Sequence, residues 1–257
     1  MKKNTLIVIA GLFFLMAWTT ASAERYVPDQ HPTGIVNWGN GKAYFFSGGQ
    51  YIRYDIASDK ADPGYPKNIN AETWPGVIWT DGIDAVVNWG NGKAYFFKGG
   101  QYIRYDIKAD RADPGYPKNI NAETWPGVIW TDGIDAVVNW GNGKAYFFKG
   151  GQYIRYDIKA DRADPGYPKN INAETWPGVI WTDGIDAVVN WGNGKAYFFK
   201  GGQYIRYDIK ADRADPGYPK NINAETWPGV IWTDGIDDAV NWGNGKAYFF
   251  KGGQYIR

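Results

Sequence analysis

The sequence predicts an all-β protein built as a propeller, and three observations support this fold. A tryptophan recurs every 51 residues within the motif Asn-Trp-Gly-Asn-Gly-Lys-Ala-Tyr-Phe-Phe, at Trp38, Trp89, Trp140, Trp191 and Trp242. Glycine and proline interrupt each repeat so often that no stretch is long enough for a helical pair. The expected strands are apolar on both faces. A period in this range with such strands is typical of propeller blades.

The copy that begins at Asp84 shows the expected elements in order. Residues 85–89 form a short strand, and the Asn-Gly pair that follows is the preferred sequence for a tight hairpin turn. Residues 93–97 form the next strand, which ends at a Gly-Gly pair. Residues 101–107 form the third strand.

The second half of the same copy predicts a less regular segment. Residues 112–117, Ala-Asp-Pro-Gly-Tyr-Pro, interrupt regular pairing and predict a short, bent outer strand. Residues 121–125 predict one helical turn, with Asn121 as its cap and Pro126-Gly127 as its end.

The strand over residues 93–97 indicates burial on both sides. Alternation sends Tyr95 and Phe97 to one face and Ala94 and Phe96 to the other, so both faces are apolar. An antiparallel sheet that is wetted on one side would alternate apolar with polar residues. Such a blade must pack between two neighbours, and the repeats must therefore close into a ring.

These residues resemble a known family. The run 95–106, Tyr-Phe-Phe-Lys-Gly-Gly-Gln-Tyr-Ile-Arg-Tyr-Asp, resembles the core of the hemopexin repeat, and 83–85, 114–117 and 125–127 resemble its inner strand, outer strand and following helix. The similarity extends over about residues 33–257. Kelch repeats have a similar period, but they usually close with more blades than this chain can supply. The resemblance implies a single four-bladed β-propeller with about four strands and a short helical turn per blade.

The resemblance also implies a narrow central channel in which carbonyl oxygens hold calcium or sodium. The matching positions, one per repeat, are Thr33, Asp84, Asp135, Asp186 and Asp237. An oxygen cage suits a hard cation such as calcium in a structural role. The alternative is that each aspartate merely orders the turn before its strand.

The number of repeats does not decide which units close the ring. Four whole units occupy 33–83, 84–134, 135–185 and 186–236, and a partial fifth unit occupies 237–257. In one closure the first unit is a continuous blade and the fifth is a spare tail. In the other, the fifth unit pairs with the segment after Tyr54 and displaces residues 33–53.

We favour the first closure. It avoids the entropy cost of joining distant ends, and Asp238 would place a charge on a strand that should be buried. Either closure leaves strands without a partner, which predicts a strand-exchanged homo-oligomer or aggregation.

The amino terminus predicts export. Residues 1–23 combine Lys2 and Lys3, an apolar run over 6–18 and the Ala-Ser-Ala stretch ending at Ala23, as a secretory signal does, and 24–32 form a lead-in. The alternative is a membrane anchor, but the run is shorter than the roughly 20 residues a span needs. We therefore expect a secreted protein, extracellular or periplasmic, that is not bound to a membrane.

Composition excludes several function classes. Once the signal is removed, 26 basic residues face 27 acidic ones, so nothing directs the protein to nucleic acid or anionic membranes. Cysteine is absent, and the single histidine, His31, lies outside the repeats. Identical carboxylates in every repeat do not make one differentiated catalytic pocket, which predicts that the chain is not an enzyme. With Met1 and Met16 removed, few haem ligands remain, which argues against haem binding.

The remaining hypothesis is a binding module for a protein, a glycan or a small cation such as a polyamine. Trp74, Trp79 and Tyr65, with their counterparts, are candidates for stacking on a ligand. The alternative is that they pack between blades, because large aromatic residues dominate cores. Near-identical blades would reinforce weak binding through multivalency. A storage or structural protein is the remaining alternative.

Overall fold

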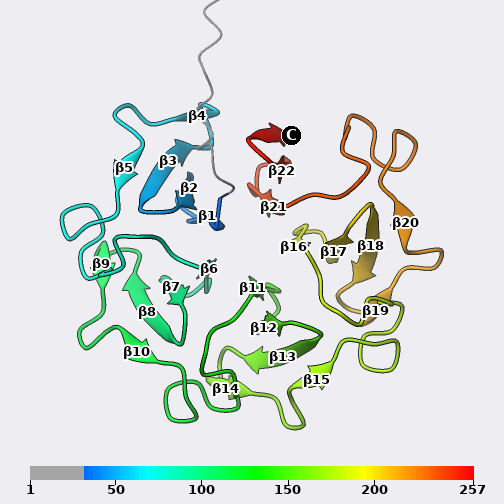
Figure 1. The fold of residues 1–257 in the computed structure, drawn as a ribbon, viewed down its shortest axis with the longest axis horizontal. Helices are drawn as coiled ribbons and strands as arrows, with labels where there is room; N and C mark the ends of the chain where they lie inside the picture. Colours follow the sequence, from blue (N-terminus) through cyan, green and yellow to red (C-terminus); the bar gives the residue numbers. More distant parts are fainter. Residues whose placement is uncertain (1–31) are drawn as a thin grey trace, which may run out of the picture.

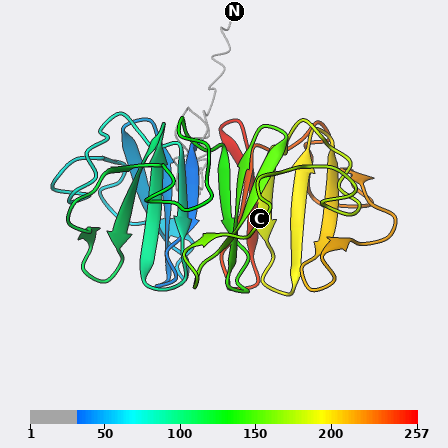
Figure 2. The ribbon, with the colours of Figure 1, turned by 90° about the horizontal axis from the view of Figure 1, so that it is seen from below.

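The computed structural model describes residues 32–257, which form five antiparallel sheets arranged as a ring around a central opening (Figure 1). The predicted signal over 1–23 and the lead-in up to residue 31 lie outside the described residues. Seen from the side, the ring is a disc with its strands standing along the axis (Figure 2). In this part of the chain, no helix is long and apolar enough to cross a membrane.

The first four blades repeat one arrangement of five strands. Blade one contains β1 (Gly34–Asn37), β2 (Lys42–Ser47), β3 (Gln50–Asp55), β4 (Lys60–Ala61) and β5 (Lys67–Asn68). Blade two contains β6 (Ala85–Asn88), β7 (Lys93–Lys98), β8 (Gln101–Asp106), β9 (Arg111–Ala112) and β10 (Lys118–Asn119). Blade three contains β11 (Ala136–Asn139), β12 (Lys144–Lys149), β13 (Gln152–Asp157), β14 (Arg162–Ala163) and β15 (Lys169–Asn170). Blade four contains β16 (Ala187–Asn190), β17 (Lys195–Lys200), β18 (Gln203–Asp208), β19 (Arg213–Ala214) and β20 (Lys220–Asn221).

The fifth blade is shorter. It contains β21 (Asp238–Asn241), β22 (Ala247–Lys251) and β23 (Gln254–Ile256). In every blade the strands follow one another outward from the channel, in the order β1-β2-β3 or its equivalent. This order is what tight hairpin turns between consecutive strands produce.

The bent outer strand that the proline-rich segment predicts is present as two short pieces. In blade two, β9 pairs with one end of β8 and β10 pairs with the other end of the same edge. Residues 113–117 between them form no ladder, because the two prolines cannot donate to one.

The predicted helical turn is wrong. Residues 121–125 form only turns and bends, although the side chain of Asn121 accepts hydrogen bonds from the backbone N–H groups of Glu123 and Thr124 at 2.9 and 3.0 Å. One N–H, that of Trp125, reaches back four residues to the carbonyl of Asn121. Pro126 follows directly and has no N–H, so the turn cannot propagate into a helix.

The core lies between adjacent blades, as the two-sided apolar strands predict. Between blades one and two, for example, Phe46 and Trp74 pack against Phe96 and Tyr105. Each of the five blade boundaries has such a cluster in the described residues.

The predicted four-bladed ring is wrong, because the fifth repeat forms a fifth blade. Inner strand β21 lies between β16 and β1 (Figure 1). Tyr248, Phe249 and Phe250 are at most 5% exposed there. As a spare tail these side chains would face water, and their burial favours insertion of the unit into the ring. Neither closure considered from the sequence is formed, since residues 33–53 also keep their place in blade one.

Candidate functional site

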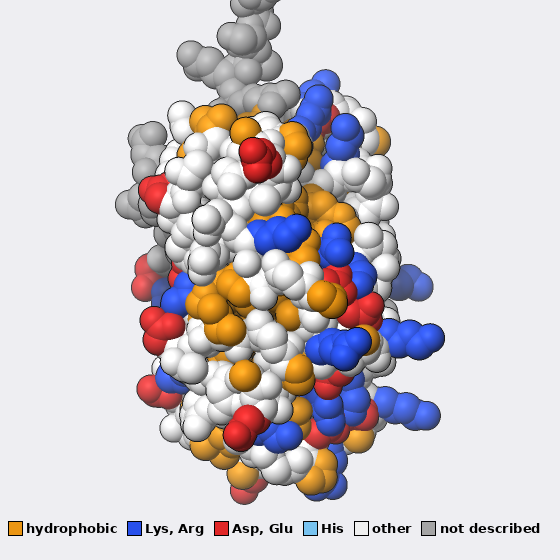
Figure 3. All heavy atoms as spheres, turned by 90° about the vertical axis from the view of Figure 1, so that its right-hand side faces the viewer, with side chains coloured by type: hydrophobic (Ala, Val, Ile, Leu, Met, Phe, Trp, Pro, Cys, Tyr) orange, Lys and Arg blue, Asp and Glu red, His pale blue; other side chains and the backbone are white. Residues whose placement is uncertain are grey.

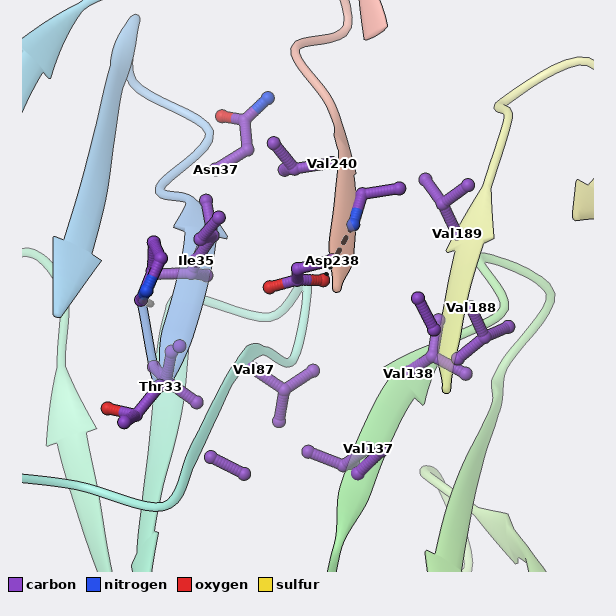
Figure 4. Close-up of a pocket in the computed structure, with 18 of the residues that line it drawn as sticks. Thr33, Ile35, Asn37, Val87, Val137, Val138, Val188, Val189, Asp238 and Val240 are labelled. Carbon is purple, nitrogen blue, oxygen red and sulfur yellow. Dashed lines mark hydrogen bonds between the residues drawn. The ribbon is translucent and has the colours of Figure 1, made fainter. Parts of the chain in front are cut away.

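The central channel is the place where all five repeats meet. A cavity of about 330 Å³ is lined by the five inner strands and by the residue that precedes each of them. Because the repeats are nearly identical, most of its wall is made of alanine, valine and isoleucine side chains (Figure 4). Apart from Asp238, the side chains along the wall are apolar, and polar side chains lie at the two ends.

The predicted cation positions lie at one end of the channel. The aspartates at these positions stabilise the Gly-Gly turns. The carboxylates of Asp84, Asp135 and Asp186 each accept the backbone N–H of the glycine that opens the Gly-Gly turn, at 2.7 Å. Asp237 accepts the N–H of Gly252 in the same way at 2.8 Å. All four aspartates are exposed.

The backbone at this end is the same in every repeat. The N–H of Thr33 donates to the carbonyl of Phe46 at 2.8 Å, as the N–H of Asp84 does to Phe97. Threonine is therefore accommodated without the carboxylate. Among residues 32–257, no three His, Cys, Asp or Glu side chains come together as metal ligands. The aspartates thus do not form a carboxylate cage, and a cation at this end would depend on backbone carbonyl oxygens.

The other end of the channel carries a ring of asparagines that the sequence analysis missed. The side-chain N–H₂ of Asn139 donates to the carbonyls of Asn88 and Trp89 in the preceding blade, at 3.2 and 2.9 Å. The same bond links each blade to the one before it. Asn37 closes the circle onto the carbonyl of Trp242 at 2.8 Å. The sequence feature that could have revealed this ring is the asparagine that precedes every repeated tryptophan.

Asp238 breaks the symmetry of the channel. Its counterparts are Ala85, Ala136, Ala187 and Gly34. Its carboxylate points into the opening, where it accepts the N–H of Ala239 at 2.7 Å (Figure 4). Burial is the main reason that the pKa of Asp238 rises to about 7, and the charge of Asp237 adds to it. Burial in the fifth blade thus favours the protonated form of the Asp238 carboxyl over the ionised form.

The three stacking candidates lie in packed positions. Trp74 is 2% exposed and Trp79 is 8% exposed, and both belong to the cluster between blades one and two. Two cations lie near the ring of Tyr65, with Arg53 Cζ at 5.3 Å and Lys67 Nζ at 4.9 Å from its centroid. Their role in ligand binding stays a prediction.

The family model described as Hemopexin matches residues 32–77, 83–128, 134–179 and 185–230. The chain belongs to the hemopexin family. Human matrix metalloproteinase-21 is 34% identical over 63% of this chain, and pig vitronectin is 39% identical over 49% of it. These matches cover 30% and 27% of the two relatives. The chain spans about a third or less of the length of the first relatives it matches, and the part shared with metalloproteinases is their hemopexin domain.

Solved hemopexin-fold structures are also similar to this chain. A Cicer arietinum albumin described as showing hemagglutination is 26% identical, with a TM-score of 0.57 over 78% of this chain and 98% of the albumin. A cow pea protein, CP4, named as a hemopexin-fold protein, is 25% identical with a TM-score of 0.56, over 77% of this chain and 96% of CP4. The hemopexin repeat predicted from the sequence is therefore confirmed, whereas the predicted number of blades and the predicted helical turn are wrong.

Proposed function

We propose that this hemopexin-family chain is a secreted, non-catalytic binding module that presents one apolar contact several times around its ring. The main support is an exposed isoleucine at the same place in each of the first four repeats. Ile78, Ile129, Ile180 and Ile231 are 61%, 60%, 57% and 73% exposed. One exposed apolar side chain is ordinary on a protein surface. The same side chain exposed at the equivalent place of four blades supplies four equivalent apolar contacts.

Each isoleucine is held by a rigid segment. Its neighbours in the sequence, Val77 and Trp79 in blade one, are 3% and 8% exposed and anchor the backbone between two blades. Because this backbone is already ordered, the isoleucine between them loses little further conformational entropy on binding. Around the rim, basic and acidic side chains are interspersed with apolar ones, as Figure 3 shows for one side. Such a surface suits a protein partner with apolar contacts and a polar border.

Multivalency would give this arrangement its affinity. Four weak, equivalent contacts on one partner or on clustered partners reinforce one another by effective concentration. The carboxylates of the repeats recur in equivalent ion pairs, for example Lys93 with Asp106 and Asp113 at 2.8 Å, which supports a binding role over one differentiated catalytic pocket.

A glycan ligand is the second candidate, and the relatives favour it. Besides the hemagglutinating albumin, a Cicer arietinum protein described as a plant lectin with two metal binding sites is 26% identical, with a TM-score of 0.51. A calcium ion held by carbonyl oxygens at the aspartate end of the channel belongs to the same proposal. A storage role is the alternative if every binding screen is negative.

Arrays of purified extracellular proteins and of glycans test the proposal. The protein is compared with a variant in which Ile78, Ile129, Ile180 and Ile231 are all changed to serine. We expect a saturable hit on the protein array that weakens stepwise as isoleucines are removed, by at least about 10-fold in the fourfold variant. Hits on glycans alone favour the second candidate. Binding that is equal in the two proteins would overturn the role of the isoleucines.

A further inference from the structure

Two kinds of dipeptide in this chain can form a succinimide ring without an enzyme. Asn-Gly occurs once in each repeat, at Asn40, Asn91, Asn142, Asn193 and Asn244. Asp-Gly occurs at Asp81, Asp132, Asp183 and Asp234. In both, the backbone nitrogen of the glycine can attack the side-chain carbon of the residue before it, because glycine has no Cβ to obstruct the approach. Both pairs satisfy this requirement in the sequence, and the tertiary structure separates them.

The Asn-Gly pairs lie in open turns. In blade two, residues 89–92 connect β6 to β7, and Asn91 in this turn is exposed. A Cβ placed on Gly92 would meet nothing within 4 Å, and the N–H of Gly92 donates no hydrogen bond within residues 32–257. The glycine nitrogen is therefore available, and the side-chain amide has room to approach it. The same open space surrounds Gly41, Gly143, Gly194 and Gly245.

The same turn activates the side-chain amide of the asparagine. The N–H of Lys93 donates to Oδ1 of Asn91 at 3.2 Å. This bond turns the amide toward the backbone that follows it, and a donor at this oxygen stabilises the negative charge that develops when the amide carbon is attacked. Nδ2 of Asn91 donates no hydrogen bond in the described part of the chain, so nothing there holds the leaving group. The bond to Oδ1 recurs at 3.1–3.2 Å in the other four turns.

The Asp-Gly pairs are closed to this reaction. Gly82 is buried, and a Cβ placed on it would lie 2.8 Å from the carbonyl oxygen of Gly48. The carboxylate of Asp81 pairs with Nζ of Lys98 at 2.6 Å, and an ionised carboxylate is a poor electrophile. At the other three pairs, a Cβ on the glycine would lie 2.8–3.1 Å from a carbonyl oxygen. These segments therefore cannot bend into a succinimide unless they first open locally.

The other asparagines of the repeat lack the following glycine. Oδ1 of Asn70 also accepts backbone N–H groups, but Ala71 follows this asparagine. Asn88 is followed by Trp89, and its Nδ2 donates to the carbonyl of Asn37 at 3.2 Å. A side chain on the next residue hinders the attacking nitrogen, and a hydrogen-bonded Nδ2 is a poorer leaving group. These asparagines are therefore unreactive internal controls.

We propose that the five Asn-Gly turns are sites of self-modification, at which asparagine is converted to aspartate and isoaspartate while the ring stays folded. At Asn91, the nitrogen of Gly92 forms a bond to Cγ, the bond between Cγ and Nδ2 breaks, and Nδ2 leaves as ammonia with the proton of the Gly92 N–H. Water then opens the succinimide. Its oxygen bonds to Cγ, which gives aspartate, or to the backbone carbonyl carbon, which gives isoaspartate.

This modification changes the charge of one face of the ring. The strands stand along the axis (Figure 2), so the turns between the first and second strands of all five blades lie on the same face. The N–H of Ile107 donates to the carbonyl of Gly92 at 3.0 Å, which places the turn with the exposed Lys108 beside that of Asn91. Lys108 forms no ion pair with another described residue. Each conversion adds a carboxylate near such cations and lowers the net charge of the chain, which is +1, by one unit.

Incubation of the whole chain in water labelled with heavy oxygen tests the proposal, because each opened succinimide takes up one labelled oxygen. Folded protein and protein in urea are incubated at neutral pH and digested with trypsin in ordinary water. The peptide 68–93 contains Asn91 together with Asn70, Asn88 and Asp81, so tandem mass spectrometry compares these positions in one molecule. Asn91 should be labelled in the folded protein no more than about 3-fold more slowly than in urea, and Asp81 at least about 10-fold more slowly. Asn70 and Asn88 should stay unlabelled in the folded protein.

Asn91→Gln is the matched variant. It gives the peptide of blade two its own mass, since 119–144 and 170–195 otherwise have the same sequence, and it should remove the label from that peptide alone because a larger ring closes more slowly. The proposal is overturned if the folded protein takes up no label at Asn-Gly, if folding slows labelling at Asn91 as much as at Asp81, or if the variant peptide is still labelled. The variant with four serines in place of the isoleucines should be labelled normally, so failure of the proposed function is recognised separately.

Discussion

Replacing Asp238 by alanine should stabilise this protein at alkaline pH, and the structure gives the size of the effect. The side chain lies in the channel, and its counterparts Ala85, Ala136 and Ala187 show that alanine fits the position. Burial, opposed by the hydrogen bond from Ala239 and assisted by the charge of Asp237, raises the pKa of Asp238 from 3.8 to about 7.

The sign of the effect follows from linkage. Because the folded protein binds the proton of Asp238 more tightly than the unfolded chain does, the contribution of this group to stability is fully present below about pH 4 and is lost as the pH rises through 7. One pKa unit corresponds to about 1.36 kcal/mol, so ionisation costs the folded state up to about 4 kcal/mol. The effective dielectric constant of a protein interior, about 20, reduces this value, and we expect about 2–4 kcal/mol at pH 8.5.

Thermal unfolding of the unchanged protein, Asp238→Ala and Asp238→Asn from pH 4 to 8.5 is the assay. For a protein of this size, the expected energy corresponds to a rise in Tm of roughly 5–15 °C at pH 8.5 in both variants. The difference from the unchanged protein should shrink to a small constant at pH 4. Asp238→Asn controls for shape, since it keeps an oxygen that accepts the N–H of Ala239. A difference that does not vary with pH would refute the reasoning.

Three further predictions concern the ring, the core and the channel. Asn139→Ala removes both hydrogen bonds from β11 to blade two and should lower the free energy of unfolding in urea by about 1–3 kcal/mol. The exposed Lys159→Ala is its control, because Ala57 stands at the counterpart position, and it should change this free energy by less than about 0.5 kcal/mol. Trp125→Ala removes an indole that is 2% exposed and should lower the free energy of unfolding by about 3–5 kcal/mol in the same assay. The exposed Ile129→Ala is its control and should not lower it in this way. Calcium at about 1 mM should raise the Tm of chelator-treated protein, measured by scanning calorimetry. Asp135→Asn should keep that rise if carbonyl oxygens are the ligands, and no rise in either protein would remove calcium from the proposal.

The repeating elements were predictable from the sequence because their causes are local. Asn91-Gly92 and Gly99-Gly100 determine where the strands of blade two turn, and the alternation in residues 94–97 shows that both faces are buried. The single helical turn was predicted wrongly although its cap, Asn121, behaves as expected, because one hydrogen bond before Pro126 does not propagate.

The sequence by itself determined the blade, and the tertiary structure decided the number of blades. Each repeat specifies its own sheet through local turns and alternation, but no repeat specifies how many neighbours complete the ring. That number depends on contacts far apart in the chain, such as the bond from Asn37 to the carbonyl of Trp242 and the insertion of β21 between β16 and β1. Asp238 favoured a spare fifth repeat only while it was taken as charged. Burial of the apolar faces of β22 outweighs the cost of keeping one carboxyl protonated, and the ring therefore closes with five blades.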